Sequence, residues 1–223
     1  MKTFIIFLFT ALLMGCHASP ATEIFPLSHN PLATVSKIQC SGFKDGDQTR
    51  VSGSAIVTDS IVITAAHIVR ACNGDSIRVI DQNRNLKASY VNDAHDLAVL
   101  GPLTSLEGLS CDLYPQDGAL LHAVGHPQAS DDEALFEGFY VEKESNSKTG
   151  TGRGYGEFGM SGGAVFDESF KTVGMFRAIT EDHKSYFFVK MSFICRELGQ
   201  LVRFYEEHGM SATIDITGSY KYE

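Results

Sequence analysis

The stretch Gly159-Met160-Ser161-Gly162-Gly163 places one serine between glycines, which leave its hydroxyl uncovered and its backbone free to turn. A hydroxyl is a poor nucleophile at neutral pH. A nucleophilic serine therefore needs a histidine base, a carboxylate that orients the histidine, and N–H donors for the oxyanion. By itself the stretch also fits a plain Gly/Ser turn, so the rest of the chain has to supply these partners.

Two further stretches supply them. His67 follows the run Val-Ile-Thr-Ala-Ala at 62–66, and Asp96 opens the apolar run Asp-Leu-Ala-Val-Leu at 96–100. Asp93 is a rival carboxylate, but only Asp96 begins an apolar run. The chain order His, Asp, Ser is the order found in the chymotrypsin fold. We therefore predict that His67 is the base, Asp96 its orienting carboxylate and Ser161 the nucleophile.

The three motifs together resemble the trypsin-like serine endopeptidases, in particular their compact bacterial members, over roughly residues 35–209. The resemblance implies an all-β fold of two six-stranded antiparallel β-barrels followed by a C-terminal α-helix. It also implies an oxyanion hole formed by the backbone N–H groups of Gly159 and Ser161. Met160 departs from the trypsins, which have an aspartate there that receives a freed N-terminus, so we expect no activation of that kind.

The spacing of short β-rich runs agrees with two barrels. We predict strands at 51–57, 60–64, 76–80, 86–91 and 96–100, and a second set at 119–124, 134–142, 163–166, 172–179 and 185–190. Residues 101–115 are expected to cross between the barrels. Residues 192–208 have helical spacing, with Ser192 as the expected N-cap. Residues 150–156 are interpreted as a mobile loop rather than a phosphate loop, because no Gly-Lys-Ser/Thr follows.

The resemblance also assigns a pocket for P1, the substrate residue before the cleaved bond. It implies Tyr155 near the pocket base and a strand at 174–179 as the pocket wall. That strand includes Phe176, Arg177 and Ala178. Phe176 stands where glutamyl endopeptidases place a histidine, so it does not support a glutamate preference. Because alternate strand residues face opposite sides, Arg177 points either at the substrate, favouring acidic P1 residues, or at Asp96.

Four cysteines remain if Cys16 is modified, and an even number in an exported chain favours disulfides. Three pairings are possible, and four buried free thiols are the remaining alternative. The resemblance implies Cys40 with Cys72, which bracket the His67 turn as a pair does in many relatives. It would leave Cys111 with Cys195, tying the crossover to the C-terminal helix.

The N-terminal residues have the pattern expected of an export signal. Residues 1–15 are predicted to be a signal peptide, with Lys2 before the apolar residues 4–14. Leu-Met-Gly-Cys at 13–16 resembles a bacterial lipobox, which would lipidate Cys16 and tether the protein to a membrane of the cell envelope. An ordinary secretion signal cleaved near Ala18 is the alternative.

The remaining domain boundaries follow from composition. Residues 16–34 are rich in Pro, Ser, Ala and Thr and are interpreted as a tether, or alternatively as an ordered arm packed on the barrel. Residues 35–209 form the predicted protease domain, and 210–223 a loosely ordered tail.

Composition narrows the function further. The 223 residues are 43% hydrophobic, enough for a real core, and the formal net charge of −9 argues against a nucleic-acid partner. His122 and His126 are four apart, but they lie in a strand-like region without an accompanying Glu, so no metal and no cofactor is expected.

The sequence thus predicts an exported serine endopeptidase acting on proteins or peptides, and leaves its natural substrate and oligomeric state open. One alternative is an inactive protease fold that serves as a binding protein, which the unusual Met160 and Arg177 favour. A non-proteolytic acyl hydrolase is the other, although its Gly-x-Ser-x-Gly turn would be followed by a helix, whereas residues 164–166 are β-like.

Overall fold

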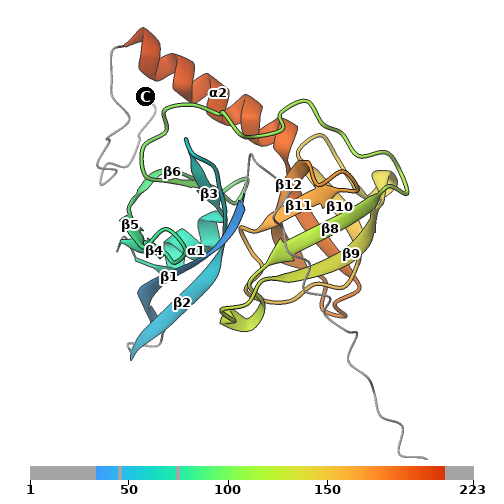
Figure 1. Cartoon of the computed structure of the whole chain (residues 1–223), viewed down its shortest axis with the longest axis horizontal. Helices are drawn as coiled ribbons and strands as arrows, with labels where there is room; N and C mark the ends of the chain where they lie inside the picture. The colour runs from blue at the N-terminus through green and yellow to red at the C-terminus, as the bar shows by residue number, and fades with distance from the viewer. Residues whose placement is uncertain (1–33, 45–46, 74–75, 209–223) are drawn as a thin grey trace, which may run out of the picture.

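Two β-barrels with one face of contact between them make up most of the chain (Figure 1). The computed structural model describes residues 34–44, 47–73 and 76–208. The strands are β1 (Thr34–Lys44), β2 (Asp47–Val57), β3 (Val62–Thr64), β4 (Ile77–Val79), β5 (Arg84–Leu86), β6 (Ala88–Asn92), β7 (Leu97–Leu100), β8 (Leu120–Gly125), β9 (Ala134–Tyr140), β10 (Thr149–Gly154), β11 (Ala164–Asp167), β12 (Thr172–Ile179) and β13 (Ser185–Lys190). The helices are α1 (Ala66–Ala71) and α2 (Met191–Glu207), with 3₁₀ turns η1 (Pro127–Ala129) and η2 (Glu142–Glu144).

The first barrel is a nearly closed sheet of seven strands in the order β5-β4-β1-β2-β3-β7-β6. Its long β1-β2 hairpin pairs Thr34 with Val57 and Lys44 with Asp47, in antiparallel register. The predicted arrangement of two barrels and a C-terminal helix is confirmed. The first sheet nevertheless has seven strands rather than six, because the chain before β7 divides into the separate short strands β4, β5 and β6.

The second barrel is closed, with six strands in the order β10-β13-β12-β11-β8-β9. Closure leaves no unpaired sheet edge. Its interior is filled by large side chains that have at most 1% of their surface exposed: Leu121, Val165, Phe176, Tyr186 and Phe188. The barrel therefore encloses a packed core rather than a channel.

Strand β10 corrects the prediction of a mobile loop at 150–156. A Cβ atom on Gly150 would come within 2.2 Å of the Phe188 ring, and one on Gly152 within 2.3 Å of the Tyr186 ring. Both glycines therefore make room for aromatic rings inside the barrel. Glycine is depleted in strands, so the alternating glycines of this segment did not indicate a strand.

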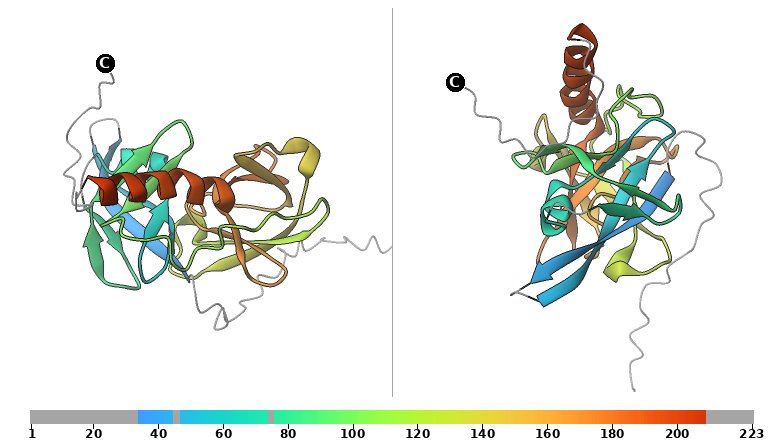
Figure 2. Two further views of the ribbon diagram at one scale, coloured as in Figure 1. Left: turned by 90° about the horizontal axis from the view of Figure 1, so that it is seen from above. Right: turned by 90° about the vertical axis from the view of Figure 1, so that its left-hand side faces the viewer.

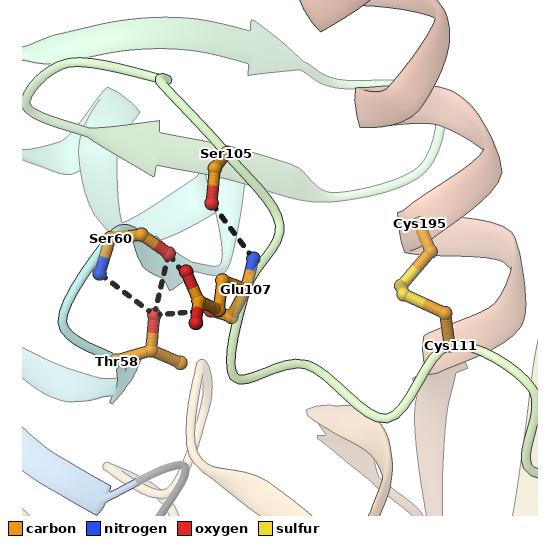
Figure 3. The surroundings of a disulfide bond; sticks show 6 residues. All are labelled: Thr58, Ser60, Ser105, Glu107, Cys111 and Cys195. Carbon is orange, nitrogen blue, oxygen red and sulfur yellow. Dashed lines mark hydrogen bonds between the residues drawn. A yellow bond between two sulfur atoms is a disulfide. The ribbon is translucent and has the colours of Figure 1, made fainter.

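The crossover between the barrels is fastened at two points (Figure 3). The backbone carbonyl of Glu107 accepts hydrogen bonds from the hydroxyls of Thr58, at 3.1 Å, and Ser60, at 2.8 Å, both on the first barrel. Four residues further on, Cys111 forms a disulfide with Cys195 on α2, with their Cα atoms 5.6 Å apart.

Helix α2 leaves the second barrel and runs back over the first (Figure 2). It begins at Met191, so Lys190 rather than the predicted Ser192 is its N-cap, and no side chain caps it. Leu198 is fully buried, and the carboxylate of Glu197 accepts a hydrogen bond from the Tyr90 hydroxyl at 2.8 Å. The helix therefore connects the second barrel to the first.

The second disulfide joins Cys40 on β1 to Cys72 at the end of α1, with their Cα atoms 5.7 Å apart. The structure thus forms both implied pairs. None of the helices in the described ranges is long and apolar enough to cross a membrane. The predicted signal peptide, Cys16, most of the tether and the C-terminal tail lie outside the described residues.

Candidate active site

The turn from β3 into α1 brings His67 to the edge of the first barrel, beside the carboxylate of Asp96. Oδ1 of Asp96 accepts the backbone N–H of His67 at 2.9 Å, and its Oδ2 lies 2.9 Å from the ring atom Nδ1. Asp96 is 8% exposed and has a left-handed φ of 54° just before β7. A carboxylate bound to both the backbone and the ring fixes the imidazole and leaves Nε2 as the nitrogen that can accept a proton.

The rival carboxylate has a different partner. Asp93 accepts hydrogen bonds from the guanidinium of Arg70 at 2.9 and 2.6 Å, and both side chains are largely exposed. The hydrogen bond from Arg70 lowers the pKa of the Asp93 carboxyl. The structure therefore brings Asp96, and not Asp93, to the ring of His67.

The loop around Ser161 carries two unused backbone donors. Gly159 and Gly162 have left-handed φ values of 96° and 87°, and the N–H of Gly162 donates to the carbonyl of Phe176 at 2.8 Å. Within the described ranges, the N–H groups of Gly159 and Ser161 donate no hydrogen bond. Two backbone donors beside a hydroxyl are suited to an anionic oxygen.

The first barrel holds this loop through Ser54 on β2, a residue that the sequence analysis missed. Its N–H donates to the carbonyl of Ser161 at 2.9 Å, and its hydroxyl donates to the carbonyl of Gly159 at 3.0 Å. The Ser54 carbonyl in turn accepts the Thr64 hydroxyl at 2.7 Å. Small polar residues in apolar strands were the only sequence signal for these contacts.

Met160 anchors the loop from the other side, fully buried in the core of the second barrel.

His67, Asp96 and Ser161 line one cavity of about 740 Å³. It is lined by His67, Arg70, Asp93, Asp96, Glu157, Phe158, Ser161, Phe176, Arg177, Ala178 and Ile179. The first barrel contributes His67 and the two aspartates, and the second contributes Ser161. The site therefore exists only where the two barrels meet.

Arg177 contacts both halves of the site. Its Nε lies 3.6 Å from Oδ2 of Asp96, and its backbone carbonyl accepts the Ser161 hydroxyl at 3.2 Å. Of the two orientations considered for Arg177, the structure has the one that faces Asp96.

Of the three other residues assigned to substrate binding, the structure places two at the cavity and one away from it. Phe176 and Ala178 line the cavity, whereas Tyr155 does not and has 41% of its surface exposed. The Tyr155 hydroxyl donates to the Glu157 carboxylate at 3.0 Å, and this hydrogen bond raises the pKa of Tyr155. Ile179, which belongs to the strand expected to form the pocket wall, also lines the cavity. Phe158 lines it as well, although it was not predicted from the sequence.

His122 and His126, the pair considered for a metal, are both buried. His122 lies on β8, and His126 directly follows it, with its N–H donating to the hydroxyl of Ser54 on the first barrel. Burial lowers the pKa of each imidazole. His122 stacks on Phe170 with 4.9 Å between the ring centroids. Among the described residues, no three His, Cys, Asp or Glu side chains lie close enough together to hold a metal ion.

Comparison with solved structures supports the fold. The chain resembles the active form of the Rv3671c protease of M. tuberculosis, with 20% identity and a TM-score of 0.60, covering 76% of this chain and 80% of that one. It also resembles a serine endoprotease of Yersinia pestis, with 16% identity and a TM-score of 0.60, covering 78% of this chain and 64% of that one. At these identities the likeness concerns the fold alone.

Sequence comparison is more limited but decisive for the family. No curated protein matches the chain. A family model described as the trypsin-like peptidase domain matches residues 51–175, which include all three motifs around His67, Asp96 and Ser161. That match covers more than half of the chain, from the first barrel into the second. The chain therefore belongs to the trypsin-like peptidase family.

Proposed function

We propose that the protein is an exported serine endopeptidase that cleaves peptide bonds through an acyl-enzyme on Ser161. The observation that carries the proposal is the double contact of Asp96 with the backbone and ring of His67, in the cavity that also contains Ser161. Family membership supports hydrolysis of protein or peptide substrates by a serine peptidase.

The chemistry assigns one role to each group. Oγ of Ser161 attacks the substrate carbonyl carbon while Nε2 of His67 takes its proton, and Asp96 stabilises the resulting imidazolium. The oxyanion accepts hydrogen bonds from the free N–H groups of Gly159 and Ser161. The C–N bond then breaks, and the leaving amine takes the proton from His67.

Hydrolysis of the ester repeats these steps with water. His67 takes a proton from the water as its oxygen attacks the acyl carbon, and returns that proton to Ser161 as the ester bond breaks. In the substrate-free molecule the Ser161 hydroxyl donates to the carbonyl of Arg177. The mechanism therefore requires that the hydroxyl rotate toward His67 when a substrate binds, as often happens when catalytic hydrogen bonds tighten in the bound complex.

A catalytically inactive binding protein is the second candidate, and Arg177 favours it. A guanidinium 3.6 Å from Asp96 competes with an imidazolium for the same carboxylate, and the carbonyl of Arg177 holds the Ser161 hydroxyl. A fluorophosphonate probe separates the two candidates, because it reacts only with an activated serine. We expect wild type to be labelled and Ser161→Ala to be unlabelled. A folded wild-type protein that is not labelled would support the binding protein.

A casein digest tests for peptide-bond hydrolysis as distinct from ester hydrolysis. We expect wild type to produce peptide fragments and Ser161→Ala to produce none. An enzyme that hydrolyses small esters but leaves casein intact would be an acyl hydrolase instead.

Export is the remaining part of the proposal. The two disulfides support it, because they form and persist in oxidising compartments. The sequence around Cys16 adds a lipid anchor in the bacterial cell envelope. Cys16→Ser should move the protein from the membrane to the soluble fraction, and unchanged fractionation would favour simple secretion.

A further inference from the structure

The path of a bound peptide across the cavity follows from the proposed chemistry, on which this inference rests. His67 delivers a proton to the leaving amine, so the part of the substrate after the cleaved bond lies toward His67. The P1 side chain then lies on the opposite side of Ser161. There the cavity is lined by Glu157 and Phe158 from one segment and by residues 176–179 from strand β12.

These two segments touch each other through Ile179. A Cβ atom placed on Gly156 would lie 2.8 Å from Cγ2 of Ile179 and 3.1 Å from Cζ of Phe176. Gly156 therefore already packs against both side chains with only its hydrogens between them. A side chain inserted between the two segments would have to displace Ile179.

The space behind Ile179 is filled as well. Phe176 is 1% exposed, and its ring stacks on that of Tyr186 with 5.5 Å between the centroids. Tyr186 is fully buried. Core packing of this density cannot yield to admit a ring without rearrangement. The recess beside Ser161 is therefore shallow, and Ile179 forms its floor.

We propose that Ile179 restricts the P1 residue of the substrate to small side chains, such as alanine, serine and glycine. Arg177 does not set this preference, because its guanidinium lies at Asp96 rather than in the recess. The proposal makes Ile179 a specificity-determining residue that acts by occupying the volume a larger P1 side chain would need.

The test uses four peptides that differ only at P1, with Ala, Val, Leu or Phe. Wild type should cleave after Ala at least about tenfold faster than after Phe, measured as kcat/KM. Ile179→Gly should raise cleavage after Phe at least about tenfold and change cleavage after Ala by less than about threefold. Ile179→Val retains a methyl group at the contact and should retain the wild-type preference.

Two further variants test whether the effect is specific to the contact between Ile179 and Gly156. Val91→Gly, on β6 of the first barrel, matches the loss of a partly buried strand side chain and should leave the preference unchanged. Gly156→Ala narrows the same gap from the opposite wall and should lower cleavage after Val relative to Ala. This variant remains informative if Ile179→Gly fails to fold.

Titration with a fluorophosphonate gives the concentration of active enzyme in each preparation. If wild type is labelled but cleaves after Phe as fast as after Ala, the inference about Ile179 is wrong while the proposed function stands. An unchanged Ala-to-Phe ratio in labelled Ile179→Gly would also overturn it. If wild type is neither labelled nor active on any peptide, the proposed function itself fails.

Discussion

Arg177 and His67 share one oxygen atom of Asp96. Oδ2 of Asp96 lies 2.9 Å from Nδ1 of His67 and 3.6 Å from Nε of Arg177. When His67 takes the proton of Ser161, two cations would compete for that carboxylate. The arrangement predicts that Arg177 weakens transition-state stabilisation.

Arg177→Ser should therefore raise kcat/KM at neutral pH and low salt. We expect about fivefold, corresponding to ~1 kcal/mol, because the side chain of Arg177 is 39% exposed and its charge is partly screened. The gain should shrink in ~1 M salt. Arg177→Lys keeps the charge and serves as the control. A fall in activity in the Arg177→Ser enzyme would mean instead that the guanidinium holds Asp96 in its productive position.

His67→Ala and Ser161→Ala should each abolish nearly all turnover, and the double variant should lose little more, since the three groups act as one unit.

Asp96→Asn should lower kcat by about 10⁴-fold. Asp93→Asn is its matched control, because Asp93 binds Arg70 and not His67, and should change kcat by less than about threefold. Steady-state kinetics on one peptide measures all five. Equal losses in the two Asp variants would contradict the assignment of Asp96.

Ser54→Ala should lower kcat by about tenfold and the free energy of unfolding by about 1 kcal/mol. The Ser54 hydroxyl donates to the carbonyl of Gly159 and accepts the N–H of His126 at 2.9 Å, so its removal should loosen the loop at residues 159–163. Ser52→Ala, two residues earlier on the same strand, tests whether any serine deletion in β2 has this effect. Unchanged kcat in Ser54→Ala would show that the loop holds its shape without this bond.

Cys40→Ser combined with Cys72→Ser should lower the free energy of unfolding by about 4 kcal/mol, from the entropy of a loop with a sequence separation of 32. Because the bridge joins β1 to the end of α1, the helix that carries His67, its loss should also reduce activity. Urea unfolding of the variant beside wild type measures the first effect. Identical midpoints would mean that the packing of the first barrel makes the bridge redundant.

Glu133 should make stability depend on pH. Burial, and then the charge of Asp81, raise the pKa of Glu133 from 4.5 to about 7. The folded state therefore binds this proton more tightly than the unfolded state, so its contribution to stability is present below about pH 4.5 and is lost as the pH rises to about 7. Glu133→Gln removes the titration and should gain ~1 kcal/mol relative to wild type across that window, after allowance for solvent screening. Urea unfolding at several pH values measures this gain, and a constant difference at all pH values would contradict it.

The sequence could predict the fold and the candidate site where the signal is local. The runs that end at His67 and begin at Asp96 have the residue types and order of one family, and the structure places both side chains at one cavity with Ser161. The orientation of Arg177 could not be predicted, because β12 has a β-bulge between Phe176 and Ala178 that breaks the regular alternation of faces at Arg177.

Contacts between distant segments had no usable signal. In the sequence Ser54 looks like any serine in a strand, because its partner, the carbonyl of Gly159, comes from the second barrel. Similarly, Gly150 and Gly152 indicated a loop because the rings of Phe188 and Tyr186, which explain them, come from a strand much later in the chain. In each case the partner that gives the residue its role is supplied by tertiary packing rather than by its neighbours in sequence.

The positions of the two disulfides determine which cuts in the chain would leave the two barrels covalently linked. Cys40–Cys72 lies within the first barrel, and Cys111–Cys195 encloses all strands of the second, so no disulfide among the described residues joins one barrel to the other. A cut at residues 112–119 would leave two fragments still linked through Cys111. A cut at 101–110 would instead leave no disulfide between the fragment bearing His67 and Asp96 and the one bearing Ser161. After a cut on one side of Cys111 the two halves of the site would stay covalently joined, and after a cut on the other side only non-covalent contacts would join them.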